Sequence, residues 1–457
     1  MVCLLLGSNP MIERCFQVRA KGSTPSRELI AGFTTFAAMA YILVVNPAVL
    51  SDAGMPREAL VTATALGAAI ATLLMAFLAN LPLALAPGMG INAFFAYAVC
   101  KGMGVPWQSA LALVFINGII FLTLSVSGIR EKIVHAIPPS LKAAIAAGIG
   151  LFIALIGFKN GGLVVDHPAT LVSLGDPTQP ATALFVLGIL LTCVLVARRV
   201  PAAILLSIAA VSLIGFMVPD GKGGAITRLP ESVVSLPASI GPLFLKLDFS
   251  FLLNEPFKAV PVIIALLLVD LFDNLGTLIA VTKRAGLMDE QGRVPGLSRA
   301  LTADSLAAII SSLLGTSTVV SYIESATGVQ AGGRTGLTAV VVAMLFLLAL
   351  FLTPVILAIP AVAVAPALVV VGILMFESVA EIDLTRFEIA APAVLTVMAM
   401  PMTFSISTGM GIGVISAVVI ALASGKGREN LTPFTCGLAA VFLLHFLEPL
   451  ILRAVGK

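Results

Sequence analysis

The chain has 457 residues, of which 59% are hydrophobic and only 11% are charged, with a formal net charge of +3. A soluble globular domain carries about 25% charged residues, so this composition excludes an ordinary soluble fold. Apolar runs of about 16–24 residues recur along the chain, which predicts an all-α polytopic membrane protein and excludes a β-barrel of alternating strands.

Seven apolar segments are expected in the first half, at 29–50, 59–80, 83–100, 107–127, 140–157, 181–197 and 200–218. The third of them reads "LALAPGMGINAFFAY" and contains Pro87, Gly88 and Gly90, which interrupt a helix. Such a break is tolerated inside a membrane only where it lines a cavity within the protein, because its backbone groups lose their helical partners. We therefore expect the third segment to be discontinuous.

Seven more segments are expected in the second half, at 258–282, 297–314, 318–330, 336–353, 360–377, 389–405 and 408–424. The segment "TVVSYIESATGVQ" is short and is followed by Gly332 and Gly333, so it is the second discontinuous one. A stretch rich in Gly, Pro and Ser, at 219–255, separates the halves. A further apolar run at 431–452 predicts an extra C-terminal helix.

The two halves resemble each other when one is shifted by 240 positions. Thr62 and Ala63 then match Thr302 and Ala303, and the same shift, without a gap, lays Gly88 on Gly328. Seven crossings is an odd number, so the two halves have opposite topology. That pattern is the inverted repeat of secondary transporters.

Lysine and arginine in the loops predict the orientation of the chain. The loops that fall on the side of the N-terminal tail hold most of them, including Lys142, Arg198, Lys283 and Arg334. Residues 1–26 contain only a short apolar run and several charges, so they predict a cytoplasmic tail and no cleaved signal peptide. We expect a multi-pass protein of the plasma (inner) membrane.

Acidic residues inside membrane segments are candidate site residues, because burying them is costly. Asp270 and Asp273 lie on one face of the eighth segment, in "DLFDNLGT", and Glu324 precedes "SATG" in the tenth. A carboxylate at the membrane midplane can accept hydrogen bonds from the N–H groups of a ligand or take up a proton. Structural roles are the competing interpretation: a neutralised support for Asp270 and a helix cap for Glu324.

Three neutral side chains complete the expected site, and one further acid, Asp304, is expected to have a structural role outside it. Asn92, in "GMGINAFF", can bind a ligand edge or satisfy broken backbone. Thr277 belongs to the small-residue surface of the eighth segment, and Phe94 offers a face for stacking. Asp304 is interpreted as a helix cap or an acid of the inner surface.

No enzyme or cofactor signature accompanies these residues. The sequence has no P-loop, no G-x-S-x-G and no H-E-x-x-H, and its five cysteines and three histidines are scattered. We therefore expect no enzyme activity, no cofactor, no metal and no nucleic-acid partner. Without an ATPase domain, coupling to an ion gradient is the economical source of energy.

Four stretches closely resemble the AzgA-like purine permeases, a branch of the nucleobase–cation symporter-2 superfamily. They are "RELIAGFTTFAAMAYILVVNPAVLSDAGMP", "APGMGINAFFAY", "LLLVDLFDNLGTLIAV" and "TSTVVSYIESATGVQAGGRTGLTAV". The resemblance implies fourteen segments in two inverted seven-segment repeats, with a short extended stretch in the third and tenth. It implies a core domain (27–130 and 257–355), a gate domain (131–218 and 356–457) and an extracellular linker (219–256). The gate domain is expected to mediate homodimerisation. Transport is expected to occur by an elevator-type movement of the core domain against the gate domain.

The resemblance also implies a substrate. In that family the acids matching Asp273 and Glu324 bind the base, and residues matching Asn92 and Asp270 matter for transport. Members carry adenine, guanine or hypoxanthine with protons, so proton coupling is assigned to Asp273 and Glu324. The alternatives are a carrier of the same fold for uracil, xanthine or an inorganic anion, and, from other classes, a membrane enzyme, a scaffold or a channel.

Overall fold

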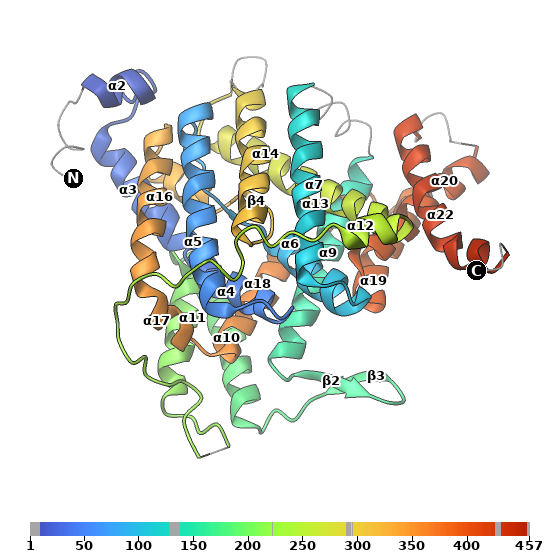
Figure 1. The fold of residues 1–457 in the computed structure, drawn as a ribbon, viewed down its shortest axis with the longest axis horizontal. Helices are drawn as coiled ribbons and strands as arrows, with labels where there is room; N and C mark the ends of the chain where they lie inside the picture. The colour runs from blue at the N-terminus through green and yellow to red at the C-terminus, as the bar shows by residue number, and fades with distance from the viewer. Residues whose placement is uncertain are drawn as a thin grey trace.

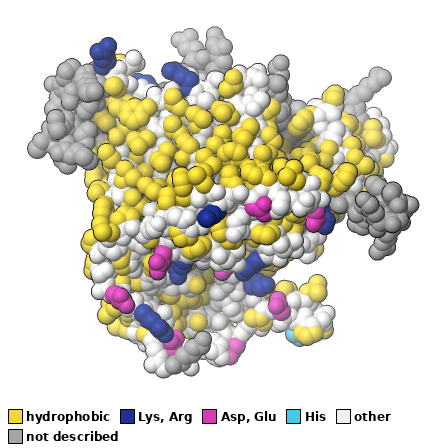
Figure 2. Space-filling model, in the orientation of Figure 1, with side chains coloured by type: hydrophobic (Ala, Val, Ile, Leu, Met, Phe, Trp, Pro, Cys, Tyr) yellow, Lys and Arg dark blue, Asp and Glu magenta, His cyan; other side chains and the backbone are white. Residues whose placement is uncertain are grey.

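A computed structural model describes residues 10–127, 138–221, 223–288, 294, 296–425 and 431–454. Within these residues, ten helices are long and apolar enough to cross a membrane, and three shorter apolar helices accompany them. Figure 2 shows a broad band of hydrophobic side chains across the upper part of one face, with charged side chains gathered mainly below it. The described chain is therefore a mostly helical, multi-pass membrane protein.

The elements follow the apolar segments of the sequence in order. In the first half they are α2 (Pro10–Phe16), α3 (Pro25–Met39), α4 (Ile42–Ser51), α5 (Arg57–Leu74), the π-helix η1 (Met75–Ala79), β1 (Leu85–Pro87), α6 (Met89–Ala93), the π-helix η2 (Phe94–Gly102), α7 (Trp107–Val126), α9 (Pro139–Asn160), β2 (Val164–His167), β3 (Leu171–Leu174), α10 (Pro180–Ala197) and α11 (Ala203–Gly215).

The second half repeats this pattern with differences. Its elements are α12 (Ser250–Asn254), α13 (Pro256–Arg284), α14 (Leu297–Leu314), β4 (Val319–Ser321), α15 (Ser325–Gln330), α16 (Gly336–Ala349), η3 (Leu350–Leu352), α17 (Thr353–Ala358), α18 (Ala361–Phe376), η4 (Glu377–Glu381), α19 (Phe387–Thr403), α20 (Ile406–Ala423) and α22 (Pro433–Ala454).

The two halves of the chain interleave in two bundles. In the first bundle, helices from 25–126 pack on helices from 256–349: α5 and α7 contact α14, and α3 contacts α15 and α16. Figure 1 shows the blue α3 and α5 beside the orange α16 and yellow α14. In the second bundle, helices from 139–215 pack on helices from 361–423, with α9 against α18 and α19 and α10 against α18.

Strands β1 and β4 join the two broken segments in the middle of the first bundle. They pair antiparallel, with Ala86 opposite Val320, and both strands are buried. The ladder continues beyond the strands, since the Gly88 N–H donates to the Thr318 carbonyl (3.1 Å) and the Tyr322 N–H donates to the Ala84 carbonyl (3.0 Å). Backbone groups that a helix would have satisfied are thus satisfied by the other half of the chain.

The predicted gapless match between the two halves holds for helices α5 and α14 and is wrong for the strands that follow them. Helix α14 begins and ends 240 residues after α5, but β4 begins 234 residues after β1. The first half contains the extra π-helical turn η1 and a left-handed residue, Asn80, before its strand. In the second half, residues 315–318 connect α14 to β4, and Gly315 is the residue of this connection that has a left-handed conformation.

Strands also occur where an all-α fold predicts none. β2 and β3 form an antiparallel hairpin after α9, with Val164 opposite Leu174. It projects at the bottom of Figure 1, away from both bundles, and Leu171 and Leu174 in it are exposed.

The linker 219–255 runs along the first bundle and is tied to it by hydrogen bonds. The Leu245 N–H donates to the Leu313 carbonyl (2.9 Å), and the Ser109 hydroxyl donates to the Asp248 carboxylate (2.7 Å). Hydrogen bonds from Ser250 and Ser109 hold the pKa of Asp248 below its usual value, so this carboxylate stays charged as an anchor.

Glu28 of α3, in the first half of the chain, binds the start of α16, in the second half, through hydrogen bonds. Its fully buried carboxylate accepts hydrogen bonds from the backbone N–H groups of Arg334 (3.0 Å), Thr335 (3.3 Å) and Thr338 (3.2 Å), and from the Thr338 hydroxyl (2.5 Å). A carboxylate at a helix start is stabilised by the free N–H groups and the helix dipole, so these bonds cap α16.

We predict that Glu28→Ala destabilises the folded protein by about 3 kcal/mol, because it leaves buried N–H groups without acceptors. The measurement is the thermal unfolding midpoint of the purified protein in detergent. Glu58→Ala, on the exposed first turn of α5, is the matched control and should leave the midpoint unchanged. Equal midpoints for both variants would contradict the capping role.

Candidate functional site

A central cavity lies where the two bundles meet, and it consists of two adjoining hollows of about 240 Å³ and 100 Å³. Asp273, Thr277, Ile323 and Met375 line both hollows. The larger hollow extends along α9 and α13, and the smaller reaches the broken segments at β4 and α6. Segments far apart in the sequence thus meet around one space.

Asp273 and Glu324 line the smaller hollow together. Asp273 lies on α13 one turn before Thr277, so both side chains project from the same face of the helix. Glu324 directly precedes α15, where the break after β4 turns the chain back into a helix. Both carboxylates are half-buried, which leaves them accessible to a molecule in the cavity.

Tyr41 holds one oxygen of the Glu324 carboxylate. The tyrosine lies between α3 and α4, and its hydroxyl donates to Glu324 Oε1 at 2.7 Å. This bond fixes the Glu324 carboxylate where it lines the smaller hollow. A second tyrosine, Tyr322, donates to the Pro87 carbonyl (2.6 Å) and fixes the end of β1 against β4.

The two bundles contribute different chemistry to the cavity. The first bundle supplies the two carboxylates, the hydroxyls of Tyr41 and Thr277 and the backbone of the broken segments. The second bundle supplies only apolar side chains, namely Ile145, Ala146 and Ile149 from α9 and Val371 and Met375 from α18. A ligand would find its hydrogen-bond partners on one side and an apolar wall on the other.

Asp270 does not line the cavity and instead organises β4. It is buried, with 1% of its surface exposed, and accepts hydrogen bonds from Asn274 (2.6 Å), Asn117 (3.1 Å) and Thr318 (3.4 Å). Asn274 in turn accepts from the Ser321 N–H at 2.7 Å. Asp270 and Asn274 therefore connect α13 to the strand that carries the chain towards Glu324.

Asn92 and Phe94 also lie away from the central cavity. Asn92 is fully buried and accepts a hydrogen bond from the Ser317 hydroxyl, and Phe94 is fully buried in the hydrophobic core. The interpretation of Asp304 as a cap or an inner-surface acid is wrong. It sits within α14 with 3% of its surface exposed, because α7 packs on this helix.

Sequence reasoning missed the Tyr41–Glu324 contact and the apolar wall. Tyr41 and Glu324 are 283 residues apart, so no local pattern links them. Met375 sits in a uniformly apolar segment, where nothing in the residue order separates a cavity-lining side chain from a packed one. The one sequence signal for Tyr41 is its rarity, since the chain has only 3 tyrosines.

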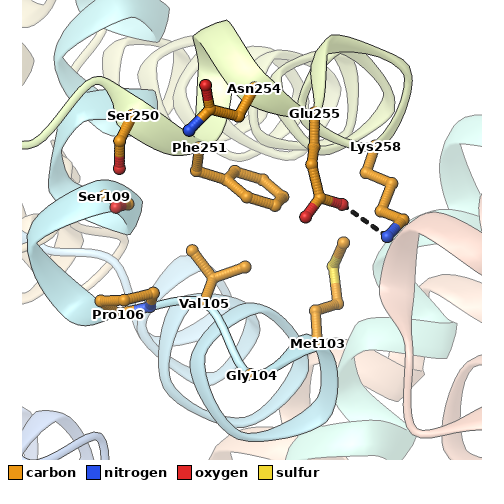
Figure 3. A pocket seen from close by; sticks show the side chains of 10 residues that line it. All are labelled: Met103, Gly104, Val105, Pro106, Ser109, Ser250, Phe251, Asn254, Glu255 and Lys258. Carbon is orange, nitrogen blue, oxygen red and sulfur yellow. Dashed lines mark ion pairs between the residues drawn. The ribbon is translucent and has the colours of Figure 1, made fainter.

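A third hollow, of about 500 Å³, lies elsewhere, between the loop before α7 and α12 with the start of α13 (Figure 3). Its charged residues are engaged with each other, as Lys258 pairs with Glu255 at 2.5 Å. Ser109 in its wall donates to Asp248. It contains none of the candidate residues, and among the described residues no group of three or more His, Cys, Asp or Glu side chains is placed to hold a metal.

The fold resembles solved membrane transporters. The transmembrane domain of the cyanobacterial bicarbonate transporter BicA superposes with a TM-score of 0.63, covering 83% of this chain and 96% of that one at 16% identity. The anion transporter SLC26A9 gives a TM-score of 0.61 over 93% of this chain and 69% of that one, at 12% identity. These likenesses and the long apolar helices show the fold of a multi-pass membrane protein.

The sequence identifies the family. The model of the Permease family (Xan_ur_permease) matches residues 26–412, and the chain belongs to this family. Similar chains include the adenine permease AdeP of Escherichia coli, 43% identical over 96% of both chains. The guanine/hypoxanthine permease PbuG of Bacillus subtilis is 42% identical over 94% of this chain and 98% of its own. The predicted resemblance to purine permeases is confirmed.

We predict that Asn274→Ala loosens β4 although Asn274 does not line the cavity. The substitution leaves the Ser321 N–H without its acceptor and costs about 1–3 kcal/mol. Hydrogen–deuterium exchange of the peptide covering 319–322 should become faster. Asn254→Ala on the exposed α12 is the matched control; unchanged exchange in Asn274→Ala would show that the strand does not depend on this contact.

Proposed function

We propose that the protein imports purine nucleobases, namely adenine, guanine or hypoxanthine, together with protons. The observation that carries the proposal is the pairing of Asp273 and Glu324 in one cavity. Adenine and guanine permeases among the relatives, about two-fifths identical over nearly the whole chain, support this substrate class.

The chemistry of the cavity suits a flat base that carries N–H groups. Each carboxylate accepts hydrogen bonds from an N–H edge, and charge-assisted hydrogen bonds of this kind are stronger than neutral ones. The carboxylates of Glu324 and Asp273 serve as acceptors, and Thr277 adds a hydroxyl. The rings of the base pack on the apolar wall of the second bundle.

Two acids in one small cavity argue against an anion as the substrate. An inorganic anion would face like charges from Asp273 and Glu324, and like charges a few ångströms apart repel strongly in a cavity with little water. Arg and Lys side chains are absent from the lining of the central cavity among the described residues. The fold shared with anion transporters therefore does not extend to the substrate we propose.

The proposed mechanism moves the first bundle, as the core, against the second bundle, as the gate. The proposed core comprises residues 27–130 and 257–355, and the proposed gate comprises residues 131–218 and 356–457. Together they contain fourteen segments arranged as two inverted repeats, in which the third and tenth segments are discontinuous. All hydrogen-bonding groups of the cavity come from the core and all gate groups are apolar. The core can therefore slide without breaking hydrogen bonds between ligand and gate, which supports an elevator.

Proton coupling is assigned to the same acids. A proton bound by Asp273 or Glu324 removes a charge from the cavity, so core movement with substrate and proton carries less charge through the low-dielectric interior. We further propose a homodimer through the gate domain, in the plasma membrane, with a cytoplasmic N-terminus and the linker outside. The placement of Lys283 and Arg334 on the proposed cytoplasmic side supports this orientation.

We predict that Asp273→Ala and Glu324→Ala each weaken purine binding by about 10–100-fold, because each removes a charge-assisted acceptor. The measurement is equilibrium binding of radiolabelled adenine, guanine and hypoxanthine to purified protein. Glu231→Ala, in the exposed part of the linker, is the control and should bind like the wild type. Unchanged binding in both cavity variants would reject the site.

We predict that Glu324→Gln keeps part of the binding but loses accumulation of substrate against a gradient, because an amide accepts a hydrogen bond but carries no titratable proton. The measurement is uptake into proteoliposomes with an imposed proton gradient, with and without a protonophore. Asp166→Asn, on the exposed hairpin, is the control. Wild-type uptake that is indifferent to the protonophore would reject proton coupling.

A further inference from the structure

Helices α9 and α18 cross at unusually short distance in the second bundle. A Cβ atom on Gly150 would lie 2.6 Å from the Gly372 carbonyl oxygen, and a Cβ on Gly372 would collide with the Gly150 carbonyl in the same way. Only glycine at both positions allows this contact between the two backbones. The crossing therefore brings the backbone of α18 closer to α9 than larger residues at these positions would allow.

This crossing determines where Met375 lies. Met375 follows Gly372 by about one helical turn, and its Cβ would be 2.8 Å from a Cβ placed on Gly150. Its thioether end reaches the opposite bundle, since its Cε lies 3.8 Å from the position of a Cβ on Gly90. The side chain thus extends from the gate wall to the broken third segment.

Met375 differs from the other wall residues in spanning the whole cavity. Ile145, Ala146 and Ile149 line only the larger hollow, and Val371 lines only the smaller one. Met375 lines both and is half-buried, so its terminal atoms bound the space left for a ligand. Methionine is unbranched and adaptable, so it fits against ligands of slightly different outline.

We infer that Met375 is the specificity-determining residue of the gate: it sets the largest substituent that a purine can carry on the edge facing away from Asp273 and Glu324. This inference rests on the proposed function. The acids hold the N–H edges of the base to the core, and the opposite edge meets Met375. An apolar wall discriminates by size alone, and one additional methylene in such a pocket changes affinity by about 10–200-fold.

The test measures competition with labelled adenine and labelled hypoxanthine by adenines that carry alkyl groups of increasing size at N6, C2 or C8. The wild-type protein should bind these adenines at least tenfold more weakly once the alkyl group on one edge of the base exceeds a limiting size. Met375→Ala should bind the first excluded compound about tenfold better than the wild type does, while still binding the parent base. Met375→Phe should exclude compounds that the wild type accepts, which provides a second reading if Met375→Ala does not fold.

Two further variants separate size from other effects. Met375→Leu has nearly the same volume and should keep the wild-type limit. Met398→Ala, on the exposed face of α19, is the matched methionine control and should also keep it. An unchanged size limit in both Met375→Ala and Met375→Phe, with the parent base still bound, overturns the inference and leaves the proposed function intact. Failure of the wild type to bind any purine overturns both.

Discussion

Backbone polar groups have to find partners inside the protein wherever a helix breaks within a membrane, because the bilayer offers none. In this chain the partners come from the opposite half: β1 pairs with β4, and the ladder runs on through Gly88 and Tyr322. Pairing the two breaks is what brings the start of α15 next to α13, and with it Glu324 next to Asp273. The position of the two acids thus follows from how the backbone is satisfied.

A second layer of polar contacts keeps this arrangement in place. Asp270 and Asn274 connect α13 to β4, and Tyr41 connects the first helical segment to Glu324. Around these contacts the second bundle is apolar where it faces the cavity. In the proposed movement of the first bundle against the second, apolar surfaces that slide past each other lose no directional bonds, whereas each broken buried hydrogen bond costs about 1–3 kcal/mol.

Much of the fold was accessible from the sequence, and the failures have physical causes. The apolar segments lie close to the observed helices, and the stretch that holds Pro87, Gly88 and Gly90 contains β1 and the short helix α6. The acids Asp273 and Glu324 stood out because charge is rare inside apolar segments.

What the sequence did not reveal depends on contacts between distant segments. The pairing of β1 with β4, the bond from Tyr41 and the position of Met375 are set by tertiary packing. The π-helical turn η1 shifts the register of the first half by six residues, and composition carries no sign of it. Asp270 and Asn92 stay predicted site residues, but neither lines the central cavity, because a polar residue in an apolar segment can be a ligand contact or a support behind it.

Glu28 has a consequence for how the protein is made. All the partners of its carboxylate lie 306 to 310 residues further along the chain. While the ribosome is still adding the second half, the Glu28 carboxylate lacks these hydrogen-bond donors, and Lys21 is a side chain of opposite charge that interacts with it. The hydrogen bonds that hold α3 against the start of α16 therefore form only after most of the chain has been made.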